Sequence, residues 1–296
     1  MMSHSWKHPA WWMHKDHWKH VLNMANLWST RHHLLYPGIR LPEPAEGLGD
    51  VILKRPDVSL RGWVERPGQS DALVVFGGNN MPLSLFRSFF KDCTEKTVYL
   101  VPYRGFEGQA GTPSEPALVG DAKALLEHVR RRHSGSVAVL GISLGTGVAM
   151  QAVHTCQSDI ERLLLVTPYD SILNVAKHHF LGFPVERMLK DWYESFKLAP
   201  TLNIPTLVMR SALDEVVPPD STDRLLEAFG NPLPVLSAPL THSQWWYEPW
   251  IHQTRTFMNA WLDGPIPKPE VFHVSEPDVP REVSWSQAVW SSGLKW

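Results

Sequence analysis

The chain has 296 residues, of which 43% are hydrophobic and 20% charged, so it can bury one large core and is too apolar for global disorder. A formal net charge of −2, without a long basic run, excludes the signature of a nucleic-acid-binding protein. Only Cys93 and Cys156 are present, which excludes a disulfide framework or zinc cluster and fits a reducing, cytoplasmic compartment. No apolar run reaches the ~18 residues that a membrane-spanning helix needs.

Residues 1–36 form a segment that holds five of the 14 tryptophans and seven of the 15 histidines. Their pattern predicts one or two amphipathic helices. Two roles stay open: peripheral contact with a membrane through residues 1–35, because Trp and Lys favour the headgroup region, or a clasp on the rest of the chain or on a second subunit. A metal site at His14, His17 and His20 is a third alternative, but one helical turn does not bring all three together, and we predict no metal.

After a Pro/Gly-rich connector, short runs of strand-forming residues follow one another along the chain. They lie at 51–55, 59–66, 72–78, 97–103, 136–142, 162–168, 206–212 and 233–239. The first two are partly polar, as in antiparallel edge strands, whereas most later runs are almost continuously apolar, as in parallel strands buried on both faces. Helical patterns at 117–133, 145–156 and 220–230 separate later strands. This alternation predicts an α/β fold with a mostly parallel central sheet and helices on both faces.

Two segments depart from this alternation. Residues 169–203 are long, mostly helical and rich in aromatic side chains, and their place after the sixth strand favours a small helical lid. Residues 264–296 are rich in Pro and Trp, which predicts an extended tail docked on the surface. The main domain is therefore expected to span 37–263.

The stretch Gly141-Ile142-Ser143-Leu144-Gly145 joins an apolar strand directly to a helix of small residues. A serine at such a sharp turn is forced into a sparsely allowed conformation, and the flanking glycines relieve crowding between strand and helix. The turn would project the Ser143 hydroxyl above the sheet edge, beside the N–H groups that begin the helix. The alternative is a Gly-rich turn in a nucleotide-binding crossover, although the glycine spacing does not match a dinucleotide fingerprint.

A nucleophilic serine needs a base and an orienting acid, which follow it in the order acid, histidine when the turn has this form. Asp214 comes just after the strand at 206–212, and His242 lies in the loop after the last strand. Asp170 is the alternative acid, with a neutral interpretation as the cap of a helix. For the oxyanion we expect the N–H of Leu144 and, from the glycine turn after the third strand, that of Asn79 rather than Asn80.

With these residues in place, the chain resembles the α/β-hydrolase superfamily, and within it the serine-aminopeptidase-like group of α/β-hydrolase-domain proteins. The similarity covers roughly residues 34–262 and includes YRGFEGQAGTPSE at 103–115, ALDEVVPP at 212–219 and THSQWW at 241–246. The chain departs from the group at Gly77-Gly78-Asn79, where the group often has His-Gly-Asn. It also has a polar and aromatic N-terminus where the group often has a membrane helix.

The resemblance implies two-step acyl transfer on a small-molecule or acyl substrate, by an esterase or thioesterase that uses no cofactor. Ser143 would be the nucleophile, His242 the base and Asp214 the orienting acid. Apolar lid residues would contact the acyl part of the substrate, namely Phe180, Met188 and Trp192, unless they pack the lid onto the body. A short-peptide or aminoacyl amidase and a non-catalytic binding protein on the same scaffold remain alternatives, and the oligomeric state stays open.

Overall fold

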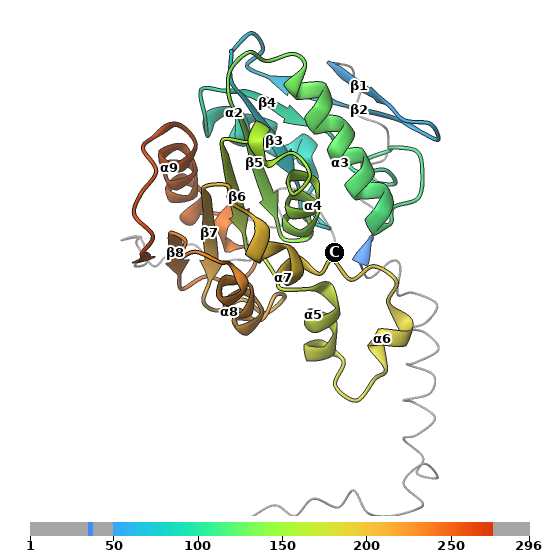
Figure 1. Ribbon diagram of the computed structural model, residues 1–296, viewed down its shortest axis with the longest axis vertical. Coiled ribbons are helices and arrows are strands. Elements are labelled where there is room, and N and C mark those ends of the chain that lie inside the picture. The colour runs from blue at the N-terminus through green and yellow to red at the C-terminus, as the bar shows by residue number, and fades with distance from the viewer. Residues whose placement is uncertain (1–34, 38–49, 275–296) are drawn as a thin grey trace, which may run out of the picture.

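The computed structural model describes residues 35–37 and 50–274 (Figure 1). Their strands form one sheet in the order β1-β2-β4-β3-β5-β6-β7-β8-β9. The strands are β1 (Val51–Lys54), β2 (Ser59–Glu65), β3 (Ala72–Phe76), β4 (Thr97–Leu100), β5 (Val137–Ile142), β6 (Arg162–Val166), β7 (Thr206–Ser211), β8 (Val235–Ala238) and β9 (Val271–His273).

The direction of each strand follows the apolar pattern of its sequence. β1 alternates buried and exposed residues and pairs antiparallel with β2, which pairs antiparallel with β4. Every residue of β3, β4 and β5 is buried, and the pairs from β4 to β9 across the sheet are parallel. The predicted α/β fold with a mostly parallel sheet is therefore confirmed.

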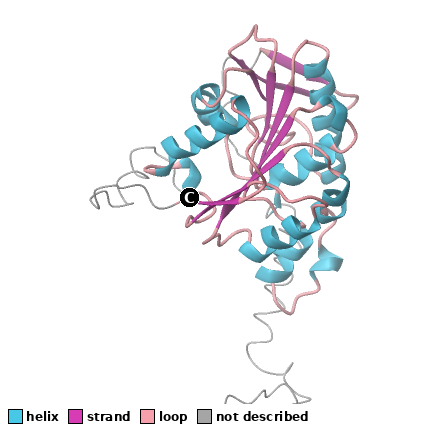
Figure 2. Cartoon of the chain, turned by 60° about the vertical axis from the view of Figure 1, so that its left-hand side comes forward, coloured by secondary structure: helices cyan, strands magenta, loops and turns pink. Residues whose placement is uncertain are grey.

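Helices cover both faces of the twisted sheet, as Figure 2 shows. One layer contains α3 (Glu115–Arg130), α4 (Leu144–Val153) and α8 (Pro219–Ala228). The other contains α2 (Arg87–Asp92), which follows the short helix η2 (Leu83–Phe86), and α9 (Trp250–Asp263). Two apolar clusters result, one on each face, and they hold the strands so that their carboxyl ends meet at one edge.

The segment expected as a lid is helical and projects from the body between β6 and β7 (Figure 1). It contains α5 (Ile172–His179), α6 (Val185–Met188) and α7 (Ser195–Leu198), followed by η4 (Ala199–Thr201). Its second half is fixed to the body, because Tyr193 is buried and its hydroxyl lies 2.9 Å from that of Tyr36.

The two ends of the chain are described only in part. Of the predicted amphipathic segment 1–36, all but residues 35 and 36 lie outside the described part, and so does the histidine cluster within it. Residues 271–273, assigned from sequence to an extended tail, pair with β8 as the short strand β9, so the sheet continues past residue 263. Within 35–37 and 50–274, no helix combines the length and apolarity needed to cross a membrane.

Candidate active site

Ser143 stands at the turn between β5 and α4, as the sequence predicts. Its backbone has φ 51° and ψ −117°, a conformation that costs a non-glycine residue about 1–3 kcal/mol. The turn is tight because both flanking glycines are in close contact. A Cβ built on Gly141 would lie 2.7 Å from Gly145 O, and one on Gly145 would overlap the Phe76 carbonyl. Only glycine at both positions lets α4 begin directly against β3 and β5.

Three side chains from distant parts of the sequence form one hydrogen-bonded chain beside this turn. His242 Nε2 lies 2.9 Å from Ser143 Oγ, and its Nδ1 lies 2.8 Å from Asp214 Oδ2. The histidine side chain is 13% exposed and the aspartate side chain 3% exposed. A carboxylate can only accept hydrogen bonds, so His242 Nδ1 carries a hydrogen and donates a hydrogen bond to Asp214. Nε2 has no hydrogen and accepts a hydrogen bond from the Ser143 hydroxyl.

The loop after β7 fixes Asp214 in this orientation. Asp214 Oδ1 accepts hydrogen bonds from the N–H groups of Val216, at 2.9 Å, and Val217, at 2.8 Å. The next residue, Glu215, points elsewhere and accepts from the backbone N–H of His242 at 3.1 Å. Both acidic residues therefore hold the histidine loop, one through its ring and one through its backbone.

Asp170, the alternative acid, is fully occupied elsewhere. Its Oδ1 accepts from the Ser221 hydroxyl at 2.5 Å and its Oδ2 from the Arg224 guanidinium at 2.7 Å. These bonds tie the start of the lid to α8. The capping residue of α5 is the neighbouring Ser171, whose hydroxyl accepts from Asn174 N–H at 3.1 Å. Asp170 is therefore a structural anchor and not the partner of His242.

Of the two predicted oxyanion donors, Leu144 directly follows the nucleophile, and Asn79 follows a glycine that approaches it. Leu144 is the first residue of α4, so its N–H has no carbonyl partner within the helix. The turn after β3 approaches from the other side: a Cβ built on Gly78 would lie 3.5 Å from Ser143 Cβ, which brings Asn79 next to the site. Among the described residues, neither of these N–H groups donates to a protein acceptor.

Two hydroxyls hold the backbone of the nucleophile turn, and the sequence carries no signal for either contact. Thr146 Oγ1 donates to Ser143 O at 2.7 Å, and Tyr169 Oη donates to Leu144 O at 3.1 Å. Tyr169 is fully buried, and burial raises the pKa of its phenol well above the usual value, so the hydroxyl keeps its proton. A Cβ on Gly147 would collide with the Tyr169 side chain, which explains the second glycine of α4.

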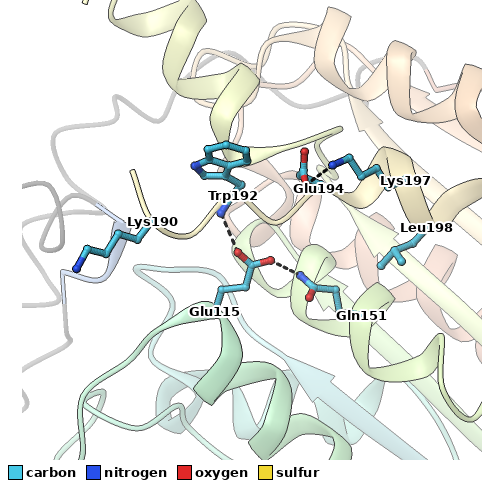
Figure 3. A pocket seen from close by; sticks show the side chains of 7 residues that line it. All are labelled: Glu115, Gln151, Lys190, Trp192, Glu194, Lys197 and Leu198. Atoms are coloured by element: carbon cyan, nitrogen blue, oxygen red, sulfur yellow. Dashed lines mark hydrogen bonds and ion pairs between the residues drawn. The ribbon is translucent and has the colours of Figure 1, made fainter. Parts of the chain in front are cut away.

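The three predicted substrate contacts lie in different surroundings. Phe180 is half-buried at the end of α5, and Met188 is buried at the end of α6. Trp192 borders a pocket of about 350 Å³ that includes Glu115 and Gln151 but no residue of the Ser143 site (Figure 3). The roles of Phe180, Met188 and Trp192 as substrate contacts stay predictions.

Glu115 explains why Trp192 is held in that pocket. One carboxylate oxygen accepts from the Trp192 backbone N–H at 2.8 Å and the other from Gln151 Nε2 at 2.7 Å, as Figure 3 shows. The lid reaches the acid loop at another point, where His179 Nε2 lies 2.8 Å from Val216 O. That contact joins the end of α5 to the loop that carries Asp214.

Comparisons with known proteins agree with this architecture. No family model matches the chain. The uncharacterised protein Rv2307c of Mycobacterium tuberculosis is 29% identical over 220 residues, which cover 70% of this chain and 78% of that protein. The alpha/beta hydrolase domain-containing protein WAV2 of Arabidopsis thaliana is 26% identical over 138 residues, which cover 41% of this chain and 45% of WAV2.

Among solved structures, the thermophilic esterase Est2 of the planctomycete Thermogutta terrifontis, with propionate bound, is similar with a TM-score of 0.57. The two chains are 18% identical, and the match covers 76% of this chain and 96% of Est2. At that identity the likeness concerns the fold. With its strand order, its strained turn between β5 and α4 and this structural likeness, the chain has the α/β-hydrolase fold.

Proposed function

We propose that this protein is a serine hydrolase that cleaves a carboxylic ester or thioester through an acyl-enzyme on Ser143. The observation that carries the proposal is the continuous hydrogen-bonded chain from Ser143 Oγ through His242 to Asp214, at 2.9 and 2.8 Å. A buried carboxylate, an imidazole with one nitrogen free to accept a proton and a hydroxyl on a strained turn are the parts that nucleophilic acyl transfer requires.

In the first step, Ser143 Oγ attacks the substrate carbonyl carbon while His242 Nε2 accepts the serine proton. The carbonyl oxygen becomes an oxyanion, which the N–H groups of Leu144 and Asn79 bind. Asp214 keeps the imidazole in the correct tautomer and stabilises the imidazolium. Collapse of the tetrahedral intermediate breaks the bond to the leaving alcohol or thiol, which takes the proton from His242.

In the second step, a water molecule replaces the leaving group. His242 removes one proton from this water while the water oxygen attacks the acyl carbon. The second tetrahedral intermediate then expels Ser143 Oγ, which regains the proton from His242. The products are a carboxylic acid and free enzyme. Neither step needs an electron acceptor or a cofactor.

An ester or thioester is favoured over an amide by the neighbourhood of the site. The lid beside it carries apolar side chains such as Phe180 and Phe183, which suit an acyl chain. Est2, similar in fold, is an esterase with propionate bound, and propionate is the acid part of a short ester. Amide hydrolysis by the same residues is the second outcome that the assay distinguishes.

The test combines covalent labelling with a substrate panel. A fluorophosphonate should label the wild type at Ser143 and should leave Ser143→Ala unlabelled. p-Nitrophenyl esters of increasing chain length, acyl thioesters and aminoacyl amides then define the substrate class. An unlabelled wild type would instead support a non-catalytic binding protein and would refute the proposal.

Asp214→Asn and Asp170→Asn are a matched pair, because each removes one buried carboxylate charge at the same edge of the sheet. Asp214→Asn should lower kcat by up to about four orders of magnitude, since the amide favours the wrong imidazole tautomer. Asp170→Asn should lower stability while kcat of the folded fraction is retained. The reverse result would assign the orienting role to Asp170.

A further inference from the structure

The loop 77–82 that carries Asn79 is anchored at both ends by one segment, residues 103–107. At its start, Tyr103 Oη donates to the Gly77 carbonyl at 2.8 Å. At its end, the Glu107 carboxylate accepts from the N–H of Leu83 at 2.7 Å and of Ser84 at 3.1 Å. These two anchors lie more than 20 residues away in sequence, and both are buried.

The segment that supplies the anchors is itself rigid. Phe106 N–H donates to Tyr103 O at 3.0 Å, so a turn sets the distance between the two anchoring side chains. Gly105 has φ 76°, and a Cβ there would lie 2.8 Å from Pro113 Cδ, so the turn has one close-packed form. Glu107 has φ 45°, in the left-handed region, which a non-glycine residue occupies at a cost.

Burying the charged side chain of Glu107 costs free energy. It is 2% exposed, and within the described residues it forms no ion pair; its carboxylate faces the N–H groups of Leu83 and Ser84 and the Ser84 side chain. Burying a carboxylate without a cation costs free energy, and buried charges are usually paired. A carboxylate here has one property that an apolar residue lacks: its two oxygens fix two consecutive N–H groups at the point where the loop ends and η2 begins.

The anchored loop needs such support because it begins with two glycines. Gly77 and Gly78 have no side chain to restrict their backbone, and Gly78 approaches Ser143. A side chain at Gly77 would meet Leu83 Cδ2 at 3.0 Å, so Leu83 would have to move to make room for it. An oxyanion donor stabilises a transition state only when it is held in place before the reaction.

We propose that Tyr103 and Glu107 are positioning residues that hold the 77–82 loop so that the Asn79 N–H points at the oxyanion. The inference rests on the proposed hydrolase function. It concerns residues other than Ser143, His242 and Asp214. The rigid turn at 103–107 supplies both side chains that hold the loop of the oxyanion donor Asn79.

The test compares Tyr103→Phe with Tyr99→Phe. Tyr99 lies on β4 and is a matched control, because its buried hydroxyl also has one partner, His133 Nε2 at 2.9 Å, away from the loop. The first readout is the rate constant for fluorophosphonate labelling of Ser143, because the phosphoryl oxygen occupies the oxyanion site and no substrate need be known. The second is kcat and KM for whichever ester the wild type hydrolyses.

Tyr103→Phe should lower the labelling rate and kcat by about tenfold, less than the loss of a whole donor, and leave KM within about twofold. Tyr99→Phe should leave all three within about twofold of the wild type. Glu107→Gln, which keeps one acceptor, should show the same split as Tyr103→Phe and serves if that variant fails to fold.

The outcomes separate the inference from the function on which it rests. A wild type that is labelled at Ser143, with Tyr103→Phe and Glu107→Gln labelled equally fast, overturns the inference alone. An increase in KM with unchanged kcat also overturns it, because that pattern belongs to substrate binding and not to the oxyanion. A wild type that is not labelled overturns the proposed function and this inference together.

Discussion

Gly145→Ala tests whether close contact between α4 and β3 positions the nucleophile. The added methyl group would lie 2.6 Å from the Phe76 carbonyl carbon and 2.7 Å from Gly77 O. Carbon atoms in contact are normally about 3.5–4.0 Å apart, so the start of α4 must move by about 1 Å. The obstacles are backbone atoms of Phe76, the last residue of β3, and of Gly77, which follows it, and they cannot rotate away as a side chain can.

Overpacking usually costs about 1–3 kcal/mol, and a rigid backbone obstacle sets the expected loss at the upper end of that range. The higher helix propensity of alanine stabilises a helix by at most about 1 kcal/mol relative to glycine. We therefore expect a net loss of about 2–3 kcal/mol in the free energy of unfolding. Because Ser143 moves with the helix, fluorophosphonate labelling should slow by about 100-fold.

Urea denaturation measures the first effect and labelling kinetics the second. Gly120→Ala is the control: it lies inside α3, and the nearest atom to its added Cβ is the flexible Arg55 Nη2 at 3.3 Å. That variant should be more stable than the wild type by about 0.5–1 kcal/mol. If the free energy of unfolding of Gly145→Ala lies within about 1 kcal/mol of the wild-type value, the contact does not constrain the turn and the reasoning is refuted.

Three further predictions concern strain and pH. Ser143→Gly should be more stable than Ser143→Ala by about 1 kcal/mol in urea, because glycine adopts φ 51° without strain; equal stabilities would show that the turn is unstrained. Burial raises the pKa of Glu107 above its ordinary value of 4.5, so the folded protein holds that proton more tightly than the unfolded chain. The stability of the wild type relative to Glu107→Gln should therefore be greatest below pH 4.5 and decrease as pH rises through the folded pKa; a difference that does not change with pH would contradict this. Hydrogen bonds from the N–H and hydroxyl of Ser136, at 2.6 and 2.9 Å, lower the pKa of Asp71. Its contribution is present above the unfolded pKa and lost as pH falls, so denaturation of Asp71→Asn at several pH values should show the opposite trend from Glu107→Gln.

The apolar pattern predicted most of the fold, because strands buried on both faces leave a signal that is local in sequence. Each predicted strand from 51–55 to 233–239 appears within a few residues of its expected bounds. The strand β9 was missed, since it has three residues and lies in a Pro-rich stretch whose composition is that of a loop. Its strand form depends on the free edge of β8, which is a tertiary feature.

The candidate site also has one part that the sequence predicted and one part that needed the tertiary structure. The turn at Ser143 could be predicted because its glycines are adjacent in sequence and the steric reason for them is local. The order of acid and histidine along the chain favoured Asp214 and His242, but only the tertiary structure separated Asp214 from Asp170. Both follow the carboxyl end of a central strand, and the difference lies in Arg224 and Ser221, which belong to a helix more than 50 residues away.

The amino-acid sequence by itself determined that this chain forms a parallel α/β sheet with a serine on a strained turn at its edge. Periodicity and glycine spacing are properties of neighbouring residues, and they act before distant segments meet. The tertiary structure decided which carboxylate faces His242, where Trp192 lies and how Tyr103 and Glu107 hold the loop at Asn79. Many of those contacts join side chains to backbone groups far away in sequence. Every residue has a backbone carbonyl, so the sequence does not indicate that the Gly77 carbonyl accepts a hydrogen bond from Tyr103.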